Sequence, residues 1–342
     1  MESLNPINLP KWDDCLKETS KPTVFISSSW LRVLNETYGY RPLFFGEGSS
    51  LKVLFPFMEV KSIITGKRAV SLPFTDFCPV ICPDQETFDN YIKKIIEYGK
   101  KKGWKYLELR GARKYLEQQP VCSVFLTHQL NISRDKKDIF NSFRNSTKRN
   151  IKKAKKNGLN IEISHKFEPV KSFYDLHCIT RKRHGVPPQP FRFFRNIHEY
   201  IISQDMGLTI TARFRNKPVA SAIFFYFADQ VIYKFGASDL KYQNLRPNNL
   251  VMWEAIKYFS ERGLKTFHFG RTAPANRGLL QFKRGWGTKE ETLNYYRYDF
   301  RQKTFIQGSS KAAESPFIQK IMQKLPIPAL KILGTILYPH VA

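Results

Sequence analysis

The spacing of apolar residues changes several times along the first part of the chain. Residues 28–39 have the three-and-four spacing of a helix that ends at Gly39, and residues 86–103 place apolar side chains on one face with lysines opposite. Short apolar runs bounded by Gly, Ser and Asp turn signals lie at 41–45, 51–60, 67–74, 79–83 and 104–110. This pattern predicts a helix, several strands, a second helix and a final strand.

Much the same order of elements is repeated later in the chain. Helical spacing predicts helices at 134–157, 169–183, 192–202, 247–262 and 278–284. Strand-like runs separated by turn signals lie at 159–164, 207–214, 218–227, 231–238, 265–270 and 293–300. The repeated order predicts an α/β (α+β) chain of two related halves, with a first domain at 1–126, a second at 127–305 and a tail at 306–342.

The tail is amphipathic. Lys320, Lys324 and Lys331 interrupt the apolar run of residues 315–342. Because of these charges the segment cannot span a membrane, which needs about 20 consecutive apolar residues. It can dock on the body of the protein or lie in a membrane interface beside anionic lipid, and both alternatives remain open.

The charge of the chain is strongly one-sided. There are 56 Lys and Arg against 29 Asp and Glu, a formal net charge of +27, so a polyanion is expected as a partner. RNA, anionic lipid headgroups and phosphorylated substrates all fit that charge. The five cysteines include no close C-x-x-C pair, the seven histidines show no metal-binding spacing, and the first residues lack the pattern of a signal peptide. We therefore expect a cytoplasmic protein without a bound metal.

One stretch concentrates this charge. Residues 143–158, FRNSTKRNIKKAKKNG, contain seven lysines and arginines and no acid. Its apolar spacing predicts a core-facing side made of Phe140, Phe143, Thr147, Ile151 and Ala154. Lys148, Lys152 and Lys156 form one row at i and i+4, where like charges repel, unless an anion lies against them. A solvated helix face and an anion-binding face therefore both remain open.

Two further segments combine cations with turn residues. Residues 268–297 contain four glycines beside Arg271, Arg277, Lys283 and Arg284, which suits an anion or a developing oxyanion, although Gly-Trp-Gly is also typical of a turn with its indole in the core. The turn YQNLRPNN puts Arg246 before Pro247, a favoured first helical residue. Free amides at that helix start could bind a phosphate or carboxylate, and an ordinary helix start is the alternative.

These segments follow one another in a recognisable order. The second half resembles the FemAB-like branch of the GNAT acyltransferase superfamily. The resemblance lies in the ordered segments GASD, RPNN, FHFGR, QFKRGWGT and LNYYRY. RNSTKRNIKKAKKNGLNIEI resembles the R-x-S-x-[KR]-R-x-I-[KR]-[KR]-A start of its second domain, and FISSSWLRVLNETYGYRPLFF resembles part of its first domain. KLPIPALKILG resembles the tail of FemAB-related proteins associated with envelope polysaccharide loci. The resemblance implies tandem GNAT-like domains, each a mixed, largely antiparallel sheet flanked by helices.

The resemblance also implies an activity. Family members transfer an acyl or aminoacyl group to an amine, which here implies an amine of a peptidoglycan or polysaccharide precursor, at the inner face of the membrane. The implied donor is aminoacyl-tRNA or acyl-CoA, with no tightly bound cofactor. The acyl-CoA loop [QR]-x-x-G-x-[GA] is missing, and YQNLRPNNL stands in its place. The alternative is a non-catalytic basic protein that binds RNA or anionic membrane on a degenerate GNAT scaffold, with a plugged cleft or with Lys283 pointing into solvent.

The chemistry of acyl transfer selects candidate residues. The attacking amine must lose a proton, and the tetrahedral intermediate concentrates negative charge on one oxygen. Lys283, in a Phe-Lys pair that the family also shows, is expected to stabilise the anionic donor or the transition state. Asp239 and Asp76, each near the end of a predicted strand, are candidate bases or amine binders, although an Asp in a turn is often a cap. Substrate or phosphate binding is expected of Arg246, Asn248, Arg271, Phe282, Trp286, Lys148 and Lys152.

Overall fold

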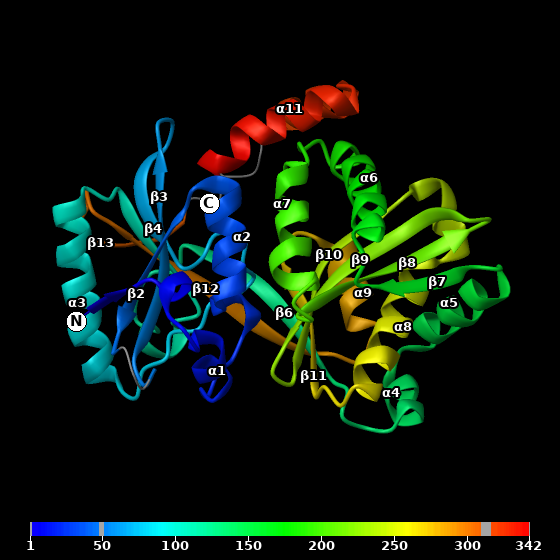
Figure 1. The fold of residues 1–342 in the computed structure, drawn as a ribbon, viewed down its shortest axis with the longest axis horizontal. Coiled ribbons are helices and arrows are strands. Elements are labelled where there is room, and N and C mark those ends of the chain that lie inside the picture. The colour runs from blue at the N-terminus through cyan, green and yellow to red at the C-terminus, as the bar shows by residue number, and fades with distance from the viewer. Residues whose placement is uncertain (1, 48–50, 309–315, 342) are drawn as a thin grey trace. The chain divides into compact units, whose positions relative to one another are not determined.

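Figure 1 shows the computed structural model of the chain, which describes all residues except 1, 48–50, 309–315 and 342. The chain forms two compact units. The first unit contains residues 1–126, 292–313 and 336–342, and the second contains residues 127–291 and 314–335. Each unit is thus assembled from more than one segment of the chain. The domain limits predicted from the sequence, at 126 and 305, stay a prediction.

The first unit is built on a mixed sheet. In sheet order its strands are β1 (Glu2–Leu4), β2 (Arg41–Gly46), β3 (Leu54–Ser62), β4 (Gly66–Val70), β5 (Tyr106–Arg110) and the end of β12 (Lys289–Asp299), with β13 (Thr304–Ile306) on β12. Strands β4 and β5 are parallel, and the other pairs with known register are antiparallel. The helices are α1 (Trp12–Lys17), α2 (Ser28–Tyr38) and α3 (Gln85–Lys102). The predicted helices at 28–39 and 86–103 are confirmed as α2 and α3.

The ends of α3 follow from its sequence. Asp84 caps the helix by accepting a hydrogen bond from the Thr87 amide at 2.7 Å, and Gly103 ends it in the left-handed region at φ 69°. Its apolar face, including Phe88 and Ile95, joins the hydrophobic cluster on the sheet of the first unit. The lysines opposite that face are exposed, as the helical spacing predicts.

The second unit has a largely antiparallel sheet. In sheet order its strands are β6 (Ser123–Asn131), β11 (Thr266–Thr272), β10 (Gln230–Ser238), β9 (Lys217–Phe227), β8 (Gly207–Phe214) and β7 (Asn160–Ser164). Strands β10 and β11 are parallel, and β10–β9, β9–β8 and β8–β7 are antiparallel. The helices are α4 (Lys136–Ser142), α5 (Asn145–Lys156), α6 (Phe167–Arg183), α7 (Phe191–Ile197), α8 (Pro247–Glu261), α9 (Arg277–Arg284), α10 (Pro316–Lys324) and α11 (Ile327–Leu337). The expected architecture, helices against largely antiparallel sheets in both halves of the chain, is confirmed.

Helices cover both faces of this second sheet. On one face Phe224 of β9 packs against Phe259 of α8, with ring centroids 5.8 Å apart, and Ile151 of α5 joins the same core cluster. On the other face Phe235 of β10 packs against Phe194 of α7 at 5.5 Å. Tyr242 and Leu245, in the segment between β10 and α8, are only partly buried against this core, so the segment lies at its edge.

The single helix predicted at 134–157 is wrong, because the chain breaks into α4 and α5. Phe143 and Arg144 are extended, with ψ near 149° and 147°, and the Arg144 amide donates to the Gly285 carbonyl at 3.0 Å. The break turns Phe143 into the core, where its ring lies 5.0 Å from Trp286. Burying that ring compensates for the missing helical hydrogen bonds. As a result α5 has a helix N-terminus of its own.

The tail forms two helices and a short final turn. Leu330 of α11 is buried, and the last residues fold into the first unit, where the Tyr40 hydroxyl donates to the Tyr338 carbonyl at 2.9 Å. Docking of the tail on the protein is therefore observed. Among the residues that the structure describes, no helix has the length and apolarity needed to cross a bilayer.

Candidate functional site

A cavity of about 340 Å³ opens in the second unit where three helices meet. It is lined by the start of α5, by the turn before α8 and by one side of α9. Its polar lining side chains include Arg144, Asn150, Gln243, Arg246, Asn248 and Gln281. The described lining contains two arginines and no acid, so the cavity suits an anionic or strongly polar ligand.

Two helices begin at this cavity without a side-chain cap. In the described structure neither Arg144, before α5, nor Arg246, before α8, accepts a capping hydrogen bond, and neither first turn contains an acid. Amides of a first turn lack the i−4 acceptor of the helix interior, and the helix dipole adds positive potential there. At α8 fewer amides are available, because Pro247 has no N–H and the Asn249 amide donates to the Arg246 carbonyl at 3.1 Å. By contrast, Asn276 caps α9 by accepting from the Leu279 amide at 3.2 Å. The uncapped start of α5 therefore supplies backbone donors for an anion, and the start of α8 supplies the Asn248 amide beside the Arg246 side chain.

Arg246 has two features that are costly without a ligand. Its backbone is left-handed, at φ 61°, which costs a non-glycine residue about 1–3 kcal/mol. Its Nε atom is buried and has no hydrogen-bond partner among the described atoms, although Arg246 lines the cavity. A buried unpaired donor is rare in folded proteins and costs about 1–3 kcal/mol. Both costs are typical of a residue held for binding.

Close packing at Gly285 holds the start of α5 against the end of α9. A Cβ atom at Gly285 would lie 2.6 Å from the Thr147 hydroxyl, which is shorter than real side-chain contacts. The Gly285 carbonyl also accepts the Arg144 amide. The Gly-Trp-Gly segment is therefore a tight turn that positions one wall of the cavity. Trp286 is fully buried behind that wall, 5.8 Å from the ring of Phe282.

The cavity brings together three of the predicted binding residues, Arg246, Asn248 and Phe282. Asn248 also donates to the Ser238 hydroxyl at 3.2 Å, so its amide is held at the end of β10. Sequence reasoning did not identify Arg144, Asn150, Gln243 or Gln281. The polar run Asn-Ser-Thr after Arg144 is a sequence signal for the start of a helix. The apolar spacing continues across it, however, and predicts one uninterrupted helix.

Lys283 is not among the described residues that line the cavity. It is 2% exposed, and its Nζ atom donates to the carbonyls of Gly270 at 2.8 Å and Arg271 at 3.3 Å. Burial, followed by the charge of Lys283, lowers the pKa of the neighbouring His128, whose Nε2 atom is 2.8 Å from a Glu290 oxygen. Lys283 does not point into solvent. Its role in transfer stays a prediction.

Three other predicted residues lie apart from the described lining of the cavity. Arg271 is half-buried on β11, Lys148 donates to the Asn141 carbonyl at 3.2 Å, and Lys152 is exposed on α5. Asp239 caps the short turn that follows β10 by accepting from the Lys241 amide at 3.0 Å. The capping function expected as the alternative for Asp239 is therefore present, and its function as a base stays a prediction.

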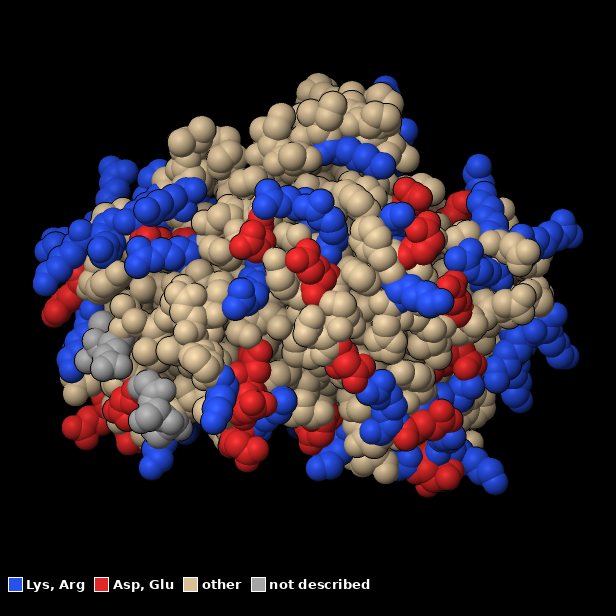
Figure 2. All heavy atoms as spheres, viewed as in Figure 1, with Lys and Arg blue, Asp and Glu red and all other residues tan. Residues whose placement is uncertain are grey.

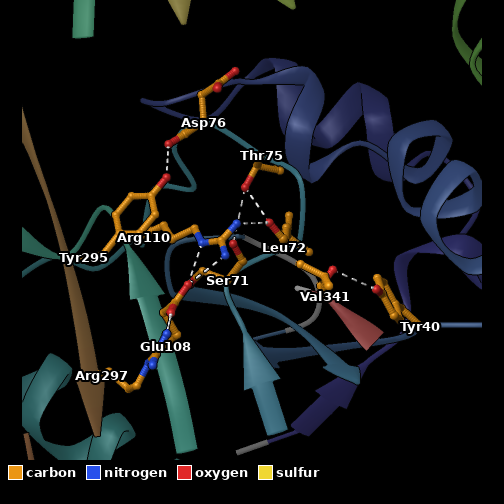
Figure 3. A network of polar contacts seen from close by, with 10 residues as sticks. All are labelled: Tyr40, Ser71, Leu72, Thr75, Asp76, Glu108, Arg110, Tyr295, Arg297 and Val341. Carbon is orange, nitrogen blue, oxygen red and sulfur yellow. Dashed lines mark hydrogen bonds and ion pairs between the residues drawn. The ribbon is translucent and has the colours of Figure 1, made fainter. Parts of the chain in front are cut away.

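Asp76 belongs to the first unit, in a loop that follows β4. Two residues of this loop, Leu72 and Phe74, are left-handed, with φ of 52° and 59°. Figure 3 shows how side chains hold the loop: the Tyr295 hydroxyl donates to the Asp76 carbonyl at 2.6 Å, and Arg110 donates to the Leu72 carbonyl at 3.2 Å. The Asp76 carboxylate lies on the far side of its backbone from Tyr295 (Figure 3). The loop is thus built to present a strained segment in one conformation.

A buried ion pair fixes Arg110 in that position. Glu108 lies 2.7 Å from Arg110 and 2.6 Å from Arg297, and both Glu108 and Arg110 are at most 5% exposed. Burial acts to raise the pKa of Glu108, but the two arginines outweigh it and hold the pKa below its ordinary value. The carboxylate is therefore ionised at neutral pH and orients the arginine that supports the loop.

Comparison with known proteins identifies the second unit. Residues 141–284 match the family model of an acetyltransferase (GNAT) domain. A Lipid II:glycine glycyltransferase of Staphylococcus haemolyticus (strain JCSC1435) is 21% identical over an alignment covering 50% of this chain. The crystal structure of FemX matches 86% of this chain and 97% of that chain, with a TM-score of 0.67 and 14% identity. These similarities support the resemblance of the chain to the FemAB-like branch of the GNAT superfamily.

Further comparisons agree with the fold and with the partial sequence similarity. A tandem GNAT protein from the clavulanic acid biosynthesis pathway matches 85% of this chain and 94% of its own, with a TM-score of 0.55 and 8% identity. A second Lipid II:glycine glycyltransferase, from Staphylococcus epidermidis (strain ATCC 12228 / FDA PCI 1200), is 31% identical over 25% of this chain. The alignments span 58% and 22% of these two transferases. The similarity therefore covers only part of each curated relative.

Proposed function

We propose that the chain transfers an acyl or aminoacyl group to an amine of a cell-envelope precursor. The observation that carries this proposal is the acid-free cavity at the uncapped starts of α5 and α8, within the matched GNAT domain. Helix-start amides, Arg144 and Arg246 together suit the phosphates of an activated donor or acceptor. Binding phosphates there would position the acyl group for attack by the amine.

The transfer requires a base and a group that stabilises the oxyanion. The amine loses a proton as it attacks the carbonyl carbon, and the tetrahedral oxygen carries negative charge until the donor leaves. We assign stabilisation of the oxyanion to Lys283. Its Nζ atom would have to exchange its hydrogen bonds to the Gly270 and Arg271 carbonyls for one to the substrate oxygen. Asp239, which belongs to the same unit as the cavity, and Asp76, which belongs to the first unit, are both proposed as groups that bind or deprotonate the amine.

The curated relatives suggest the substrates to test first. Their names give lipid II as acceptor and glycine as the transferred group. We propose a lipid II-like precursor as acceptor, with aminoacyl-tRNA or acyl-CoA as donor, in the cytoplasm at the inner face of the membrane. The tail would assist there, because α10 exposes Phe317 and Ile318 beside Lys320 and Lys324, a composition that suits anionic lipid.

Arg246→Gln is expected to lower kcat/KM for transfer by about 10- to 100-fold. Losing a charged hydrogen-bond donor to a phosphate costs about 1.5–3 kcal/mol, and each 1.4 kcal/mol is about tenfold. The measurement is the rate at which labelled donor modifies the precursor. Arg215→Gln is the matched control, since Arg215 is also left-handed, at φ 48°, but lies in an exposed turn between β8 and β9. Equal decreases in both variants would show that the cavity does not bind the substrate.

The lysines of α5 are expected to strengthen binding of a polyanionic donor. Figure 2 shows Lys and Arg side chains gathered over the α5 end of the second unit. Changing Lys148, Lys152 and Lys156 to Gln should weaken tRNA binding and flatten its salt dependence, by up to about 0.9 in log–log slope for each phosphate that is no longer neutralised. The measurement is tRNA affinity at several salt concentrations.

A second set of lysines provides the control for that experiment. The control changes three exposed lysines of α3 to Gln, namely Lys93, Lys94 and Lys100. This triple variant loses the same total charge as the α5 variant. If both triple variants weaken binding equally, the effect is one of net charge alone. If the α5 variant binds like the unchanged protein, this helix face is only solvated.

A further inference from the structure

The turn between β3 and β4, in the first unit, exposes two adjacent isoleucines. Residues 61–67 read KSIITGK, and Ile63 is 95% exposed while Ile64 is 62% exposed. Ile63 gains almost nothing from burial in the fold and Ile64 gains little, so this apolar surface costs solubility and adds little to stability. No acid occurs between residues 60 and 75, and Lys61 beside the isoleucines is exposed.

Hydrogen bonds fix the conformation of this turn. The Ser62 hydroxyl accepts from the amides of Ile64 at 3.1 Å and Thr65 at 2.9 Å. The His340 carbonyl accepts from the Thr65 hydroxyl at 3.2 Å and from Arg68 at 2.8 Å. The turn is therefore tied to the C-terminal residues of the same unit. Holding two isoleucines outward in this way removes the entropy cost that a partner would otherwise have to offset.

The charges around the turn are cationic. Lys105 is exposed, and its side chain lies beside Gly66, where a Cβ atom would come within 2.3 Å of it. Glu59 is nearby on β3, but it is 4% exposed and paired with Lys67 at 3.2 Å. The end of the chain adds Val341, which is 56% exposed, to the apolar side chains of this unit. An apolar tip surrounded by lysines complements an anionic surface with an apolar layer beneath it.

We propose that the turn at 61–67 inserts Ile63 and Ile64 into an anionic lipid bilayer while the lysines contact its headgroups. Two side chains are too small an area for a stable protein interface, which buries about 1,200–2,000 Å². They are sufficient to add to a membrane contact that is also electrostatic, because each buried isoleucine favours partitioning. This inference does not rest on the transferase proposal, since it concerns binding and not transfer.

The test is binding of the full chain to vesicles of phosphatidylglycerol and, separately, of phosphatidylcholine. We expect the unchanged protein to bind phosphatidylglycerol vesicles more tightly than phosphatidylcholine vesicles. The double variant Ile63→Ser, Ile64→Ser should bind phosphatidylglycerol vesicles with an affinity at least about tenfold lower. The control is Ile163→Ser, Ile179→Ser, which changes two isoleucines of 37% and 39% exposure in the second unit and should bind like the unchanged protein. Thermal unfolding of the Ile63 and Ile64 variant should match that of the unchanged protein, because those side chains are exposed. The control side chains are partly buried, so binding of the control variant is measured at a temperature where its own unfolding curve shows it to be folded.

Three outcomes would overturn the proposal. The unchanged protein does not bind phosphatidylglycerol vesicles, the Ile63 and Ile64 variant binds as tightly as before, or both double variants bind equally weakly. The second outcome would assign membrane contact to the tail alone. Self-association through the turn, seen as a change in mass by sedimentation without vesicle binding, would identify a protein contact instead. Binding is measured without donor or acceptor, so the presence or absence of transfer activity leaves the result unchanged.

Discussion

Glu108→Ala is expected to lower the free energy of unfolding by about 3–5 kcal/mol, the range typical of breaking a buried ion pair by removing one partner. The carboxylate is buried between Arg110 and Arg297, at 2.7 and 2.6 Å. Its removal would leave the Arg110 guanidinium, itself only 5% exposed, without a counter-charge. The measurement is the shift of the denaturant midpoint. Glu97→Ala, at an exposed position on α3, should change stability by less than about 0.5 kcal/mol.

Acidification should reduce the difference in unfolding free energy between the unchanged protein and Glu108→Ala. The pKa of Glu108 is lower in the folded chain than its ordinary value of 4.5, so the ion pair contributes stability above that value. The contribution is lost as pH falls through the lowered folded pKa. The gap in stability between the unchanged protein and Glu108→Ala should therefore narrow below about pH 4.5. A gap that stays constant into acid would show that the carboxylate acts by packing rather than by charge.

Lys283→Ala is expected to decrease transfer by at least about 100-fold, which is typical of removing one oxyanion-stabilising donor. The variant should still fold, but it leaves the carbonyls of Gly270 and Arg271 without the Nζ donor that each has now. That change costs about 1–3 kcal/mol, so stability has to be measured on the same samples. A decrease in kcat for protein that remains folded at the assay temperature would separate the two effects.

A nearby lysine gives the control for this variant. Lys289, on β12, has a side chain that is 78% exposed and forms an ion pair with Glu291 at 2.7 Å. Lys289→Ala removes the same charge without touching the core, and we expect its transfer rate to be unchanged. If Lys283→Ala retains full activity, the role assigned to Lys283 is wrong and its contacts are structural.

Local signals were sufficient to predict most elements but not the break after α4. Helices α2 and α3 have a regular apolar face and a glycine at the C-terminal end, so spacing and capping agree. Across residues 140–154 the apolar spacing also continues without interruption. At the end of α4, Phe143 packs between Trp253 and Trp286, at ring distances of 5.6 and 5.0 Å, and the Arg144 amide donates to the Gly285 carbonyl. Those partners are distant in the sequence, so no local pattern contains this information.

Only some residues of the candidate site could be predicted from the sequence. Arg246 and Asn248 could be identified because a proline at the first helical position marks the start of α8. Arg144 was missed as a site residue because the start of α5 depends on the break. The alternation in β5 puts Glu108 and Arg110 on one face of the strand, but it cannot show that this face is covered. Burial of a charged pair depends on the rest of the sheet.

The central claim is that the cavity at the starts of α5 and α8 binds a substrate of acyl transfer. The most direct measurement gives the full chain a lipid II precursor with labelled aminoacyl-tRNA or labelled acyl-CoA, and compares Arg246→Gln with Arg215→Gln. We predict that label moves to an amine of the precursor from one of the two donors, that Arg246→Gln loses most of this transfer, and that Arg215→Gln keeps it. Transfer from neither donor, or equal transfer by both variants, would contradict the claim.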